Sequence, residues 1–189
     1  MDPPPRPPVE PVGAIVVVAR AQGLATAVDR WTPPEVTLFG DGSAVLRGPV
    51  RDGMMTGRVR DIPADRIREL YRIADRAGLF RGRVHDRGDI VDAGALTVRI
   101  TDDHGSHETV VVGPEAREGG IRGRVLAFPG AVRDSGVDGG DYLPERYAVV
   151  DPSGTRPCRV LEGSSPAENQ GAGLVIRPLL PNERTCADL

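Results

Sequence analysis

The stretch PEVTLFGDGSAVLRG, from Pro34 to Gly48, decides the fold class, because it joins two short apolar runs through a Gly-Asp-Gly step. Val36 and Leu38 alternate with their neighbours, and the apolar pattern resumes after the turn at Ala44. Asp-Gly between two such runs is a strong hairpin signal, because the turn needs backbone angles with φ > 0 that glycine and aspartate tolerate. We therefore expect Asp41 to be a turn residue in an antiparallel hairpin rather than a catalytic acid.

The sheet is expected to extend well beyond this hairpin. Apolar and β-branched runs bounded by glycine, proline or aspartate indicate strands at residues 14–20, 36–39, 44–46, 95–101, 107–112, 147–150 and 174–177. Residues 48–57 are expected to form a loop. The sequence therefore predicts an antiparallel-rich sheet of about five to seven strands.

One well-formed helix is expected at residues 63–78. Pro63 suits the first helical position, Asp65 favours the positive helix start, and Gly78 suits the left-handed stop. Apolar residues recur at helical spacing and form one stripe, which consists of Ile67, Leu70, Tyr71, Ala74 and Ala77. Because this stripe should pack on the sheet, the expected fold class is α+β.

A second helix, at residues 121–135, is expected to be broken. Val125, Phe128 and Val132 fall on one side of it. Pro129 lies inside the pattern, however, and a proline removes a backbone donor and clashes with the preceding turn. The sheet is therefore expected to be packed by one well-formed helix and one broken helix.

The chain is expected to form one domain with an extended N-terminal arm. Residues 1–11 contain six prolines, which favour a flexible, extended segment. They lack the apolar stretch of a signal peptide. We expect residues 12–189 to form a single α+β domain. A place in the cell envelope would require a signal that was removed or lies outside this sequence; otherwise we expect a cytoplasmic protein.

The composition excludes several classes of protein. All 24 basic residues are arginine, so no lysine is present for a phosphate-binding loop or a Schiff base. The formal net charge of -3 gives no reason to expect a nucleic-acid partner. The longest apolar run, Val12–Ala19, is much shorter than the roughly 20 residues that cross a bilayer. We therefore expect no transmembrane segment.

A candidate metal site lies in the stretch DDHGSH at residues 102–107. Asp102, His104 and His107 offer one carboxylate and two imidazoles, which are ligands for zinc-like ions. The alternative is a polar hairpin turn, because these residues do not lie on a helix and their spacing does not guarantee that they converge.

A second cluster of polar residues occurs in RVHDRGDIVDAG. It combines one histidine with three carboxylates, a set suited to acid–base catalysis in a pocket that shifts their pKa values. The alternative is an irregular connection whose aspartates accept hydrogen bonds from nearby backbone amides. The residues of this possible acidic cluster are His85, Asp86, Asp89 and Asp92.

Cys158 and Cys186 are the only two cysteines. They are either a disulfide, favoured if the protein lies outside the cytosol, or two buried free thiols. The sequence contains neither a Gly-x-Ser-x-Gly motif nor a Cys–His signature, which argues against serine or cysteine hydrolase chemistry without excluding it. Whether the protein is an enzyme is left open, leaning to no, and no cofactor is expected.

Several stretches resemble an uncharacterised family of actinobacterial secreted or lipid-anchored proteins. They are AIVVVARAQG, PPEVTLFGDGSAV, RAGLF, VDAGALTVRITDDHGSHETVVVG, YLPERYAVV and VIRPLLPNERTC. The terminal RPLLPNE is the most specific of these motifs. The resemblance implies a small mixed α/β domain, a proline-rich spacer and an extracytoplasmic disulfide between Cys158 and Cys186. It implies no catalytic residues.

The leading hypothesis is a non-enzymatic, envelope-associated or secreted domain that binds or scaffolds an unknown protein or envelope component. It rests on the cysteine pair, the proline-rich arm and the resemblance. The alternative is a metal-dependent enzyme or metal-binding protein that uses the hairpin of Asp102, His104 and His107. A third hypothesis is an intracellular partner protein, which would contain reduced cysteines.

Overall fold

The computed structural model describes residues 5–7, 15–22, 31–86, 94–114, 118–163 and 173–189. In this part of the chain the strands form one eleven-stranded sheet. The strands are β1 (Ile15–Gln22), β2 (Val36–Phe39), β3 (Ser43–Arg51), β4 (Met54–Asp61), β5 (Val84–His85), β6 (Ala95–Asp102), β7 (Gly105–Val112), β8 (Val137–Asp141), β9 (Arg146–Val150), β10 (Arg159–Glu162) and β11 (Val175–Pro178). The helices are α1 (Ala64–Ala77) and α2 (Gly120–Asp134), with the 3-10 turns η2 (Leu79–Arg81) and η4 (Cys186–Asp188).

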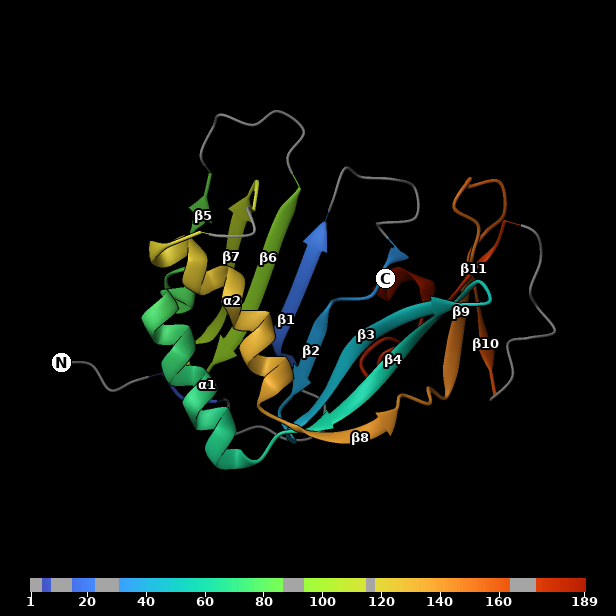
Figure 1. The fold of residues 1–189 in the computed structure, drawn as a ribbon. Coiled ribbons are helices and arrows are strands. Elements are labelled where there is room, and N and C mark those ends of the chain that lie inside the picture. Colours follow the sequence, from blue (N-terminus) through green and yellow to red (C-terminus); the bar gives the residue numbers. More distant parts are fainter. Residues whose placement is uncertain (1–4, 8–14, 23–30, 87–93, 115–117, 164–172) are drawn as a thin grey trace.

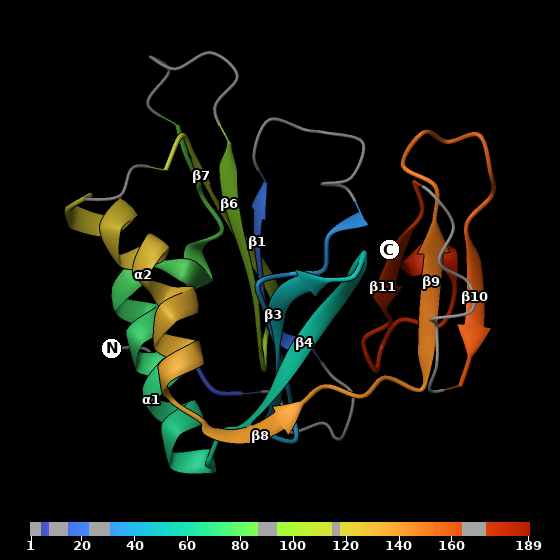
Figure 2. The same cartoon turned by 45° about the vertical axis from the view of Figure 1, so that its right-hand side comes forward.

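The sheet is mixed. Its strands follow the order β10-β9-β11-β4-β3-β2-β1-β6-β7-β5, and β8 pairs with β4 beside this path. The pairs β5–β7 and β11–β4 are parallel, whereas neighbours such as β1–β6 and β3–β4 are antiparallel. Both helices lie near one end of the sheet, and β9, β10 and β11 lie near the other (Figure 1). Figure 2 shows the same separation from a second side.

The expected antiparallel-rich sheet of five to seven strands is therefore wrong. Eleven strands are present in the described residues, and two of their pairings are parallel. The sequence patterns missed β4, β5, β8 and β10. These strands are short or rich in glycine and charge, as in VDGGD of β8, so their local pattern is weak. Neighbouring strands supply their hydrogen bonds, and local periodicity does not show such pairing.

The β2–β3 hairpin has the expected turn. Gly42 has a φ of +91°, and its N–H donates to the Phe39 carbonyl at 3.1 Å. The Asp41 carboxylate accepts hydrogen bonds from the Ser43 N–H at 2.8 Å and from the Ser43 hydroxyl at 2.6 Å. Asp41 thus stabilises the turn through its own neighbours.

Replacing Gly42 with valine should lower the free energy of unfolding by about 1 to 3 kcal/mol, because a β-branched residue at positive φ is strained. A Cβ at this position would also lie 2.7 Å from the Ile62 carbonyl oxygen, which is backbone and cannot easily move. Asp41→Asn is the matched control and should change stability little, since the amide oxygen still accepts from Ser43. Urea unfolding of both variants checks this; equal stabilities would contradict it.

Helix α1 agrees with its sequence pattern. Pro63 is its N-cap, one residue before the first helical position expected for it. Gly78 is its C-cap, with a φ of 75° and an N–H that donates to the Ala74 and Asp75 carbonyls. The buried residues are the predicted stripe, Ile67, Leu70, Tyr71, Ala74 and Ala77. Helix α2, in contrast, is continuous across Pro129, so the expected broken helix is wrong. Burial of the apolar face of α2 outweighs the hydrogen bond that Pro129 cannot make.

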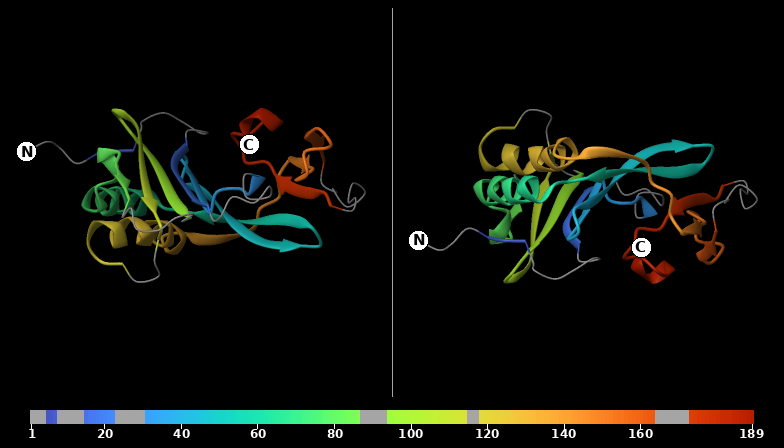
Figure 3. Two further views of the ribbon diagram at one scale, coloured as in Figure 1. Left: turned by 90° about the horizontal axis from the view of Figure 1, so that it is seen from above. Right: turned by 90° about the horizontal axis from the view of Figure 1, so that it is seen from below.

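The helices and the C-terminal turn cover opposite faces of the sheet. Alternate residues of β2 and β6, such as Val36, Leu38 and Val98, form the main core with α1 and α2. Seen from above and from below, α2 lies on one side of β1 and β2, and η4 lies on the other (Figure 3). The face away from the helices therefore meets the C-terminal part of the chain.

Candidate functional site

The C-terminal segment, defined here as residues 179–189, lies on the face of the sheet opposite α2. Leu179 and Leu180, which directly follow β11, are both buried. Leu180 packs against Phe39 of β2 and Val45 of β3, whose side chains point away from the main core. Apolar burial therefore holds the start of the segment against the sheet.

A buried ion pair fixes the turn that follows. Arg177 of β11 and Glu183 have side chains that are 1% and 3% exposed. Two hydrogen bonds join the guanidinium to the carboxylate, at 2.9 Å from Nη1 to Oε2 and 2.7 Å from Nη2 to Oε1. The Leu180 N–H also donates to Glu183 Oε2 at 2.8 Å. Arg177 and Glu183 are the ends of the motif RPLLPNE, so this motif builds a closed turn.

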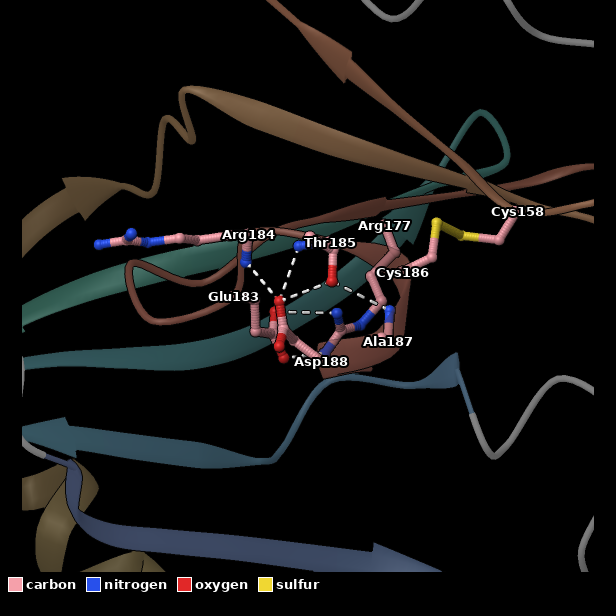
Figure 4. Close-up of a disulfide and its surroundings, with 8 residues drawn as sticks. All are labelled: Cys158, Arg177, Glu183, Arg184, Thr185, Cys186, Ala187 and Asp188. Atoms are coloured by element: carbon pink, nitrogen blue, oxygen red, sulfur yellow. Dashed lines mark hydrogen bonds and ion pairs between the residues drawn. A yellow bond between two sulfur atoms is a disulfide. The ribbon is translucent and has the colours of Figure 1, made fainter.

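Cys158 and Cys186 form a disulfide, with Cα atoms 6.1 Å apart, that joins η4 to the residues preceding β10 (Figure 4). Thr185 and Asp188 add a capping box to η4. The Thr185 hydroxyl accepts from the Ala187 N–H at 3.2 Å, and Asp188 Oδ2 accepts from the Thr185 N–H at 2.7 Å. The expected disulfide is confirmed, and it fastens the end of the C-terminal segment.

A cleft of about 180 Å³ lies between this segment and the sheet. β1, β2, β6 and β7 supply one side of it, and the C-terminal segment supplies the other. Thr37, Thr97, Arg99 and Glu108 are polar residues on the sheet side, and Asn182 and Asp188 are polar residues on the segment side. We call this space the C-terminal cleft.

The charged groups in the C-terminal cleft are bound to protein atoms. Arg99 Nη2 donates to Glu108 Oε2 at 2.8 Å. Asp188 Oδ2 accepts from the Arg184 N–H at 2.8 Å and from the N–H and hydroxyl of Thr185. The Arg184 and Thr185 amides, followed by the Thr185 hydroxyl, hold the pKa of Asp188 below its usual range. Asp188 therefore stays anionic at neutral pH and serves as a structural acceptor.

Thr37 differs from these groups. It is 0% exposed and lines the C-terminal cleft, while its neighbours Val36 and Leu38 point into the core beneath the helices. Its hydroxyl has no hydrogen-bond partner among the described residues. Sequence reasoning missed this residue; a threonine between two core positions of a strand was the available signal. The hydroxyl is therefore an enclosed polar group beside the C-terminal cleft.

The structure brings two of the three predicted metal ligands together. Asp102 is the last residue of β6, and His107 lies on β7, across the turn. Asp102 Oδ1 and His107 Nε2 are 3.2 Å apart, but the two atoms are not aligned for a hydrogen bond. The His104 side chain is 79% exposed and lies beside Asp103 instead. No group of three His, Cys, Asp or Glu side chains able to hold a metal occurs in the described residues.

Asp102 has a clear structural role in that turn. Its Oδ1 accepts from the backbone N–H groups of His104 at 2.8 Å and Gly105 at 3.0 Å. Burial raises the pKa of Asp102, but these two amides and His107 together outweigh burial and lower it. The metal-binding hypothesis stays a prediction, which stoichiometric metal in protein purified without an affinity tag would support.

The second predicted cluster is only partly described. Asp89 and Asp92 lie outside the described residues. His85 lies on β5, opposite Val111 of β7, and its carbonyl accepts a hydrogen bond from the Arg122 guanidinium. Asp86 follows β5 and is exposed. The acid–base role of this cluster stays a prediction.

The turn that leads to Cys158 contains an aspartate with a strongly perturbed pKa. Asp151 accepts from the Ser153 hydroxyl at 2.5 Å and from the Thr155 hydroxyl at 2.7 Å. These two hydroxyls, Ser153 first, lower the pKa of Asp151 to about 2. Because the folded pKa lies below the unfolded value of about 3.9, the carboxylate stabilises the fold above about pH 4, and this contribution is lost as the pH falls toward 2.

Asp151→Asn should therefore destabilise the protein at pH 7 and have progressively less effect as the pH falls from about 4 to about 2. The asparagine cannot ionise, so it removes the pH-dependent part of the interaction while it keeps one acceptor. Urea unfolding of the wild type and the variant at pH 7, 4 and 2.5 measures the difference. A difference that is constant across this range would contradict the role of the Asp151 charge.

One structural finding and three comparisons with known proteins also bear on function. Within the described residues, no helix is both long enough and apolar enough to span a bilayer. A scan against protein-family models and searches of curated proteins and of solved structures find no match to this chain. The assignment of a function therefore rests on the geometry of the C-terminal cleft and of the disulfide beside it.

Proposed function

We propose that the protein is a non-enzymatic binding or scaffolding domain that works outside the cytosol, in the cell envelope or as a secreted protein. The observation that carries this proposal is the Cys158–Cys186 disulfide, which fastens the segment that forms one side of the C-terminal cleft. Disulfides form and persist in oxidising compartments and are rare in the cytosol. A cross-linked wall also keeps a cleft in one arrangement, which lowers the entropic cost of binding.

The acids beside the cleft support binding rather than catalysis. Glu183 is occupied by Arg177 and the Leu180 N–H, and Asp188 by the amides of its own turn. The pKa of Asp188 is held low by its donors, and a carboxylate of that kind is a poor general acid or base near neutral pH. These side chains therefore shape the cleft, and the binding groups are the neutral ones beside them.

The sequence resemblance supports the same location. In that family the small domain follows a signal or lipid anchor, and we propose that residues 1–11 act as the corresponding spacer. An extended proline-rich segment keeps a domain at a distance from the surface to which it is attached. The proposed partner is a protein or another component of the envelope.

The redox state of the native protein tests the proposed location. Protein taken directly from cells should be quenched in acid to stop thiol–disulfide exchange, then unfolded and alkylated near neutral pH, before and after reduction, and weighed by mass spectrometry. We expect no alkylated thiol before reduction and two after it. Two free thiols in the native protein would contradict export. Turnover in a broad hydrolase screen, abolished by one substitution at Asp102 or His107, would contradict a non-enzymatic function.

A further inference from the structure

Leu143, in the connection between β8 and β9, is the starting point for an interaction surface. Among the described residues it is the most exposed of the large apolar side chains, at 83%. A single exposed leucine is common on protein surfaces, so its exposure alone indicates nothing. Three further features distinguish Leu143: its rigid support, the apolar hollow beside it and the charges on its two sides.

The chain fixes Leu143 from both of its neighbours. The Tyr142 N–H donates to the Gly57 carbonyl at 2.9 Å, and the Tyr142 hydroxyl donates to the Leu179 carbonyl at 2.7 Å. On the other side Pro144 is buried, and a proline restricts the backbone of the residue that precedes it. The backbone that presents Leu143 is therefore already ordered, which lowers the entropic cost of packing this side chain against a partner.

A surface hollow of about 190 Å³ lies beside Leu143. Its lining includes Pro49, which is exposed, and Met54 and Tyr142, which are half-buried, so apolar atoms are accessible to a partner. Methionine side chains adapt to the shape of a contacting group. Because an apolar cavity of about 150 Å³ holds a benzene molecule, this hollow has room for one leucine side chain.

Two charged side chains lie on opposite sides of Leu143. Arg51 lines the same hollow as Leu143. Glu145 lines a second hollow, of about 400 Å³, which shares Leu143 with the first. Both side chains are exposed, and neither forms a hydrogen bond or an ion pair with the described residues. One positive and one negative charge are therefore available to a partner.

This surface is complementary to itself. The other charged groups of the two hollows have protein partners, since Arg58 pairs with Asp141 at 3.5 Å and Arg146 donates to a backbone carbonyl at 3.5 Å. In a twofold contact the same patch of each copy faces its counterpart in the opposite direction. Such a contact brings Arg51 opposite the partner's Glu145, and the reverse pair forms at the same time.

We propose that this surface binds a second copy of the chain, with each Leu143 inserted into the hollow of the other copy and two Arg51–Glu145 pairs at the rim. The inference goes beyond the proposed function and holds for either cellular compartment. One apolar anchor per copy makes a small interface, so we expect a weak dimer with a Kd on the order of 10 µM.

Sedimentation equilibrium of the full-length, oxidised protein, at about 1 to 300 µM, tests the dimer around that Kd. Leu143→Asp should weaken it at least about 100-fold, because a carboxylate would be buried twice in each dimer. The Tm of this variant at low concentration should equal that of the wild type, because the side chain is 83% exposed. Val84→Asp is the matched control: Val84 is 69% exposed on β5, at the opposite end of the sheet, and its variant should dimerise like the wild type.

Charge reversal tests the twofold arrangement. Arg51→Glu and Glu145→Arg should each weaken the dimer about 10-fold, because like charges then face each other twice. The double variant Arg51→Glu/Glu145→Arg should recover the wild-type Kd. An equimolar mixture of the two single variants should also form a dimer of nearly wild-type Kd, since opposite charges face each other again in both pairs.

Three outcomes would overturn the inference. They are a monomer at every concentration, a dimer that Leu143→Asp leaves intact, and a mixture of the two charge variants that associates no more tightly than either variant alone. None of them changes the thiol count of the native protein, on which the proposed location depends, so the two failures are distinguishable.

Discussion

Replacing Glu183 with alanine should lower the free energy of unfolding by about 3 to 5 kcal/mol, the cost of leaving one partner of a buried ion pair uncompensated. The Arg177 side chain, 1% exposed in the folded protein, would lose both hydrogen bonds to the carboxylate. The Leu180 N–H would also lose its acceptor. Urea unfolding at pH 7, with the disulfide intact, measures the change.

Two further variants show whether the effect comes from the unpaired charge. The double variant Arg177→Met/Glu183→Leu removes both charges and should recover a large part of the lost stability, since apolar replacement of a buried pair is often close to neutral. Glu69→Ala disrupts an exposed pairing with Arg72 and Arg76 on α1 and should have little effect. Equal effects of Glu183→Ala and Glu69→Ala would contradict a structural role for the buried pair.

Removing the disulfide should have a similarly large effect. The double variant Cys158→Ser/Cys186→Ser should lose about 3 to 4 kcal/mol of unfolding free energy, because the cross-link restricts the unfolded chain. The estimate applies to a sequence separation of 28 residues. Denaturant unfolding of the variant is compared with that of the oxidised wild type.

The same experiment has an internal control. Wild-type protein unfolded in the presence of a reducing dithiol should match the double serine variant, because both lack the cross-link and retain the Arg177–Glu183 pair. If the serine variant were as stable as the oxidised protein, the disulfide would not be what holds the C-terminal segment in place.

The sequence correctly predicted the elements that depend only on residues close together in the chain, such as helix α1 and the β2–β3 turn. The α1 stripe and its left-handed stop at Gly78 agree with the sequence, because a helix satisfies its hydrogen bonds internally. The Gly40–Gly42 turn agrees for a similar reason, since glycine supplies the positive φ. A second signal of the same kind was overlooked: Asp52 and Gly53, with φ of 50° and 75°, connect β3 to β4 where a loop was expected at 48–57.

The candidate site was harder to predict. A cysteine pair is visible in a sequence, but its bonding depends on two positions that are adjacent only in the folded chain. The histidines and acids at 102–107 suggested a metal site. In the structure, the Asp102 carboxylate instead accepts hydrogen bonds from backbone amides of its own turn. Thr37 carries no unusual motif and gains its importance from burial beside the C-terminal segment.

The sequence by itself determined the local geometry of this protein: the glycine turns, the α1 helix and the alternation that gives β2 and β6 two different faces. These features depend on backbone angles and side-chain periods that neighbouring residues impose. The tertiary structure decided the number of strands, their parallel pairings, the Arg177–Glu183 pair and the C-terminal cleft. Each of these depends on contacts between segments far apart in the chain, and burial then determines which polar groups find a partner.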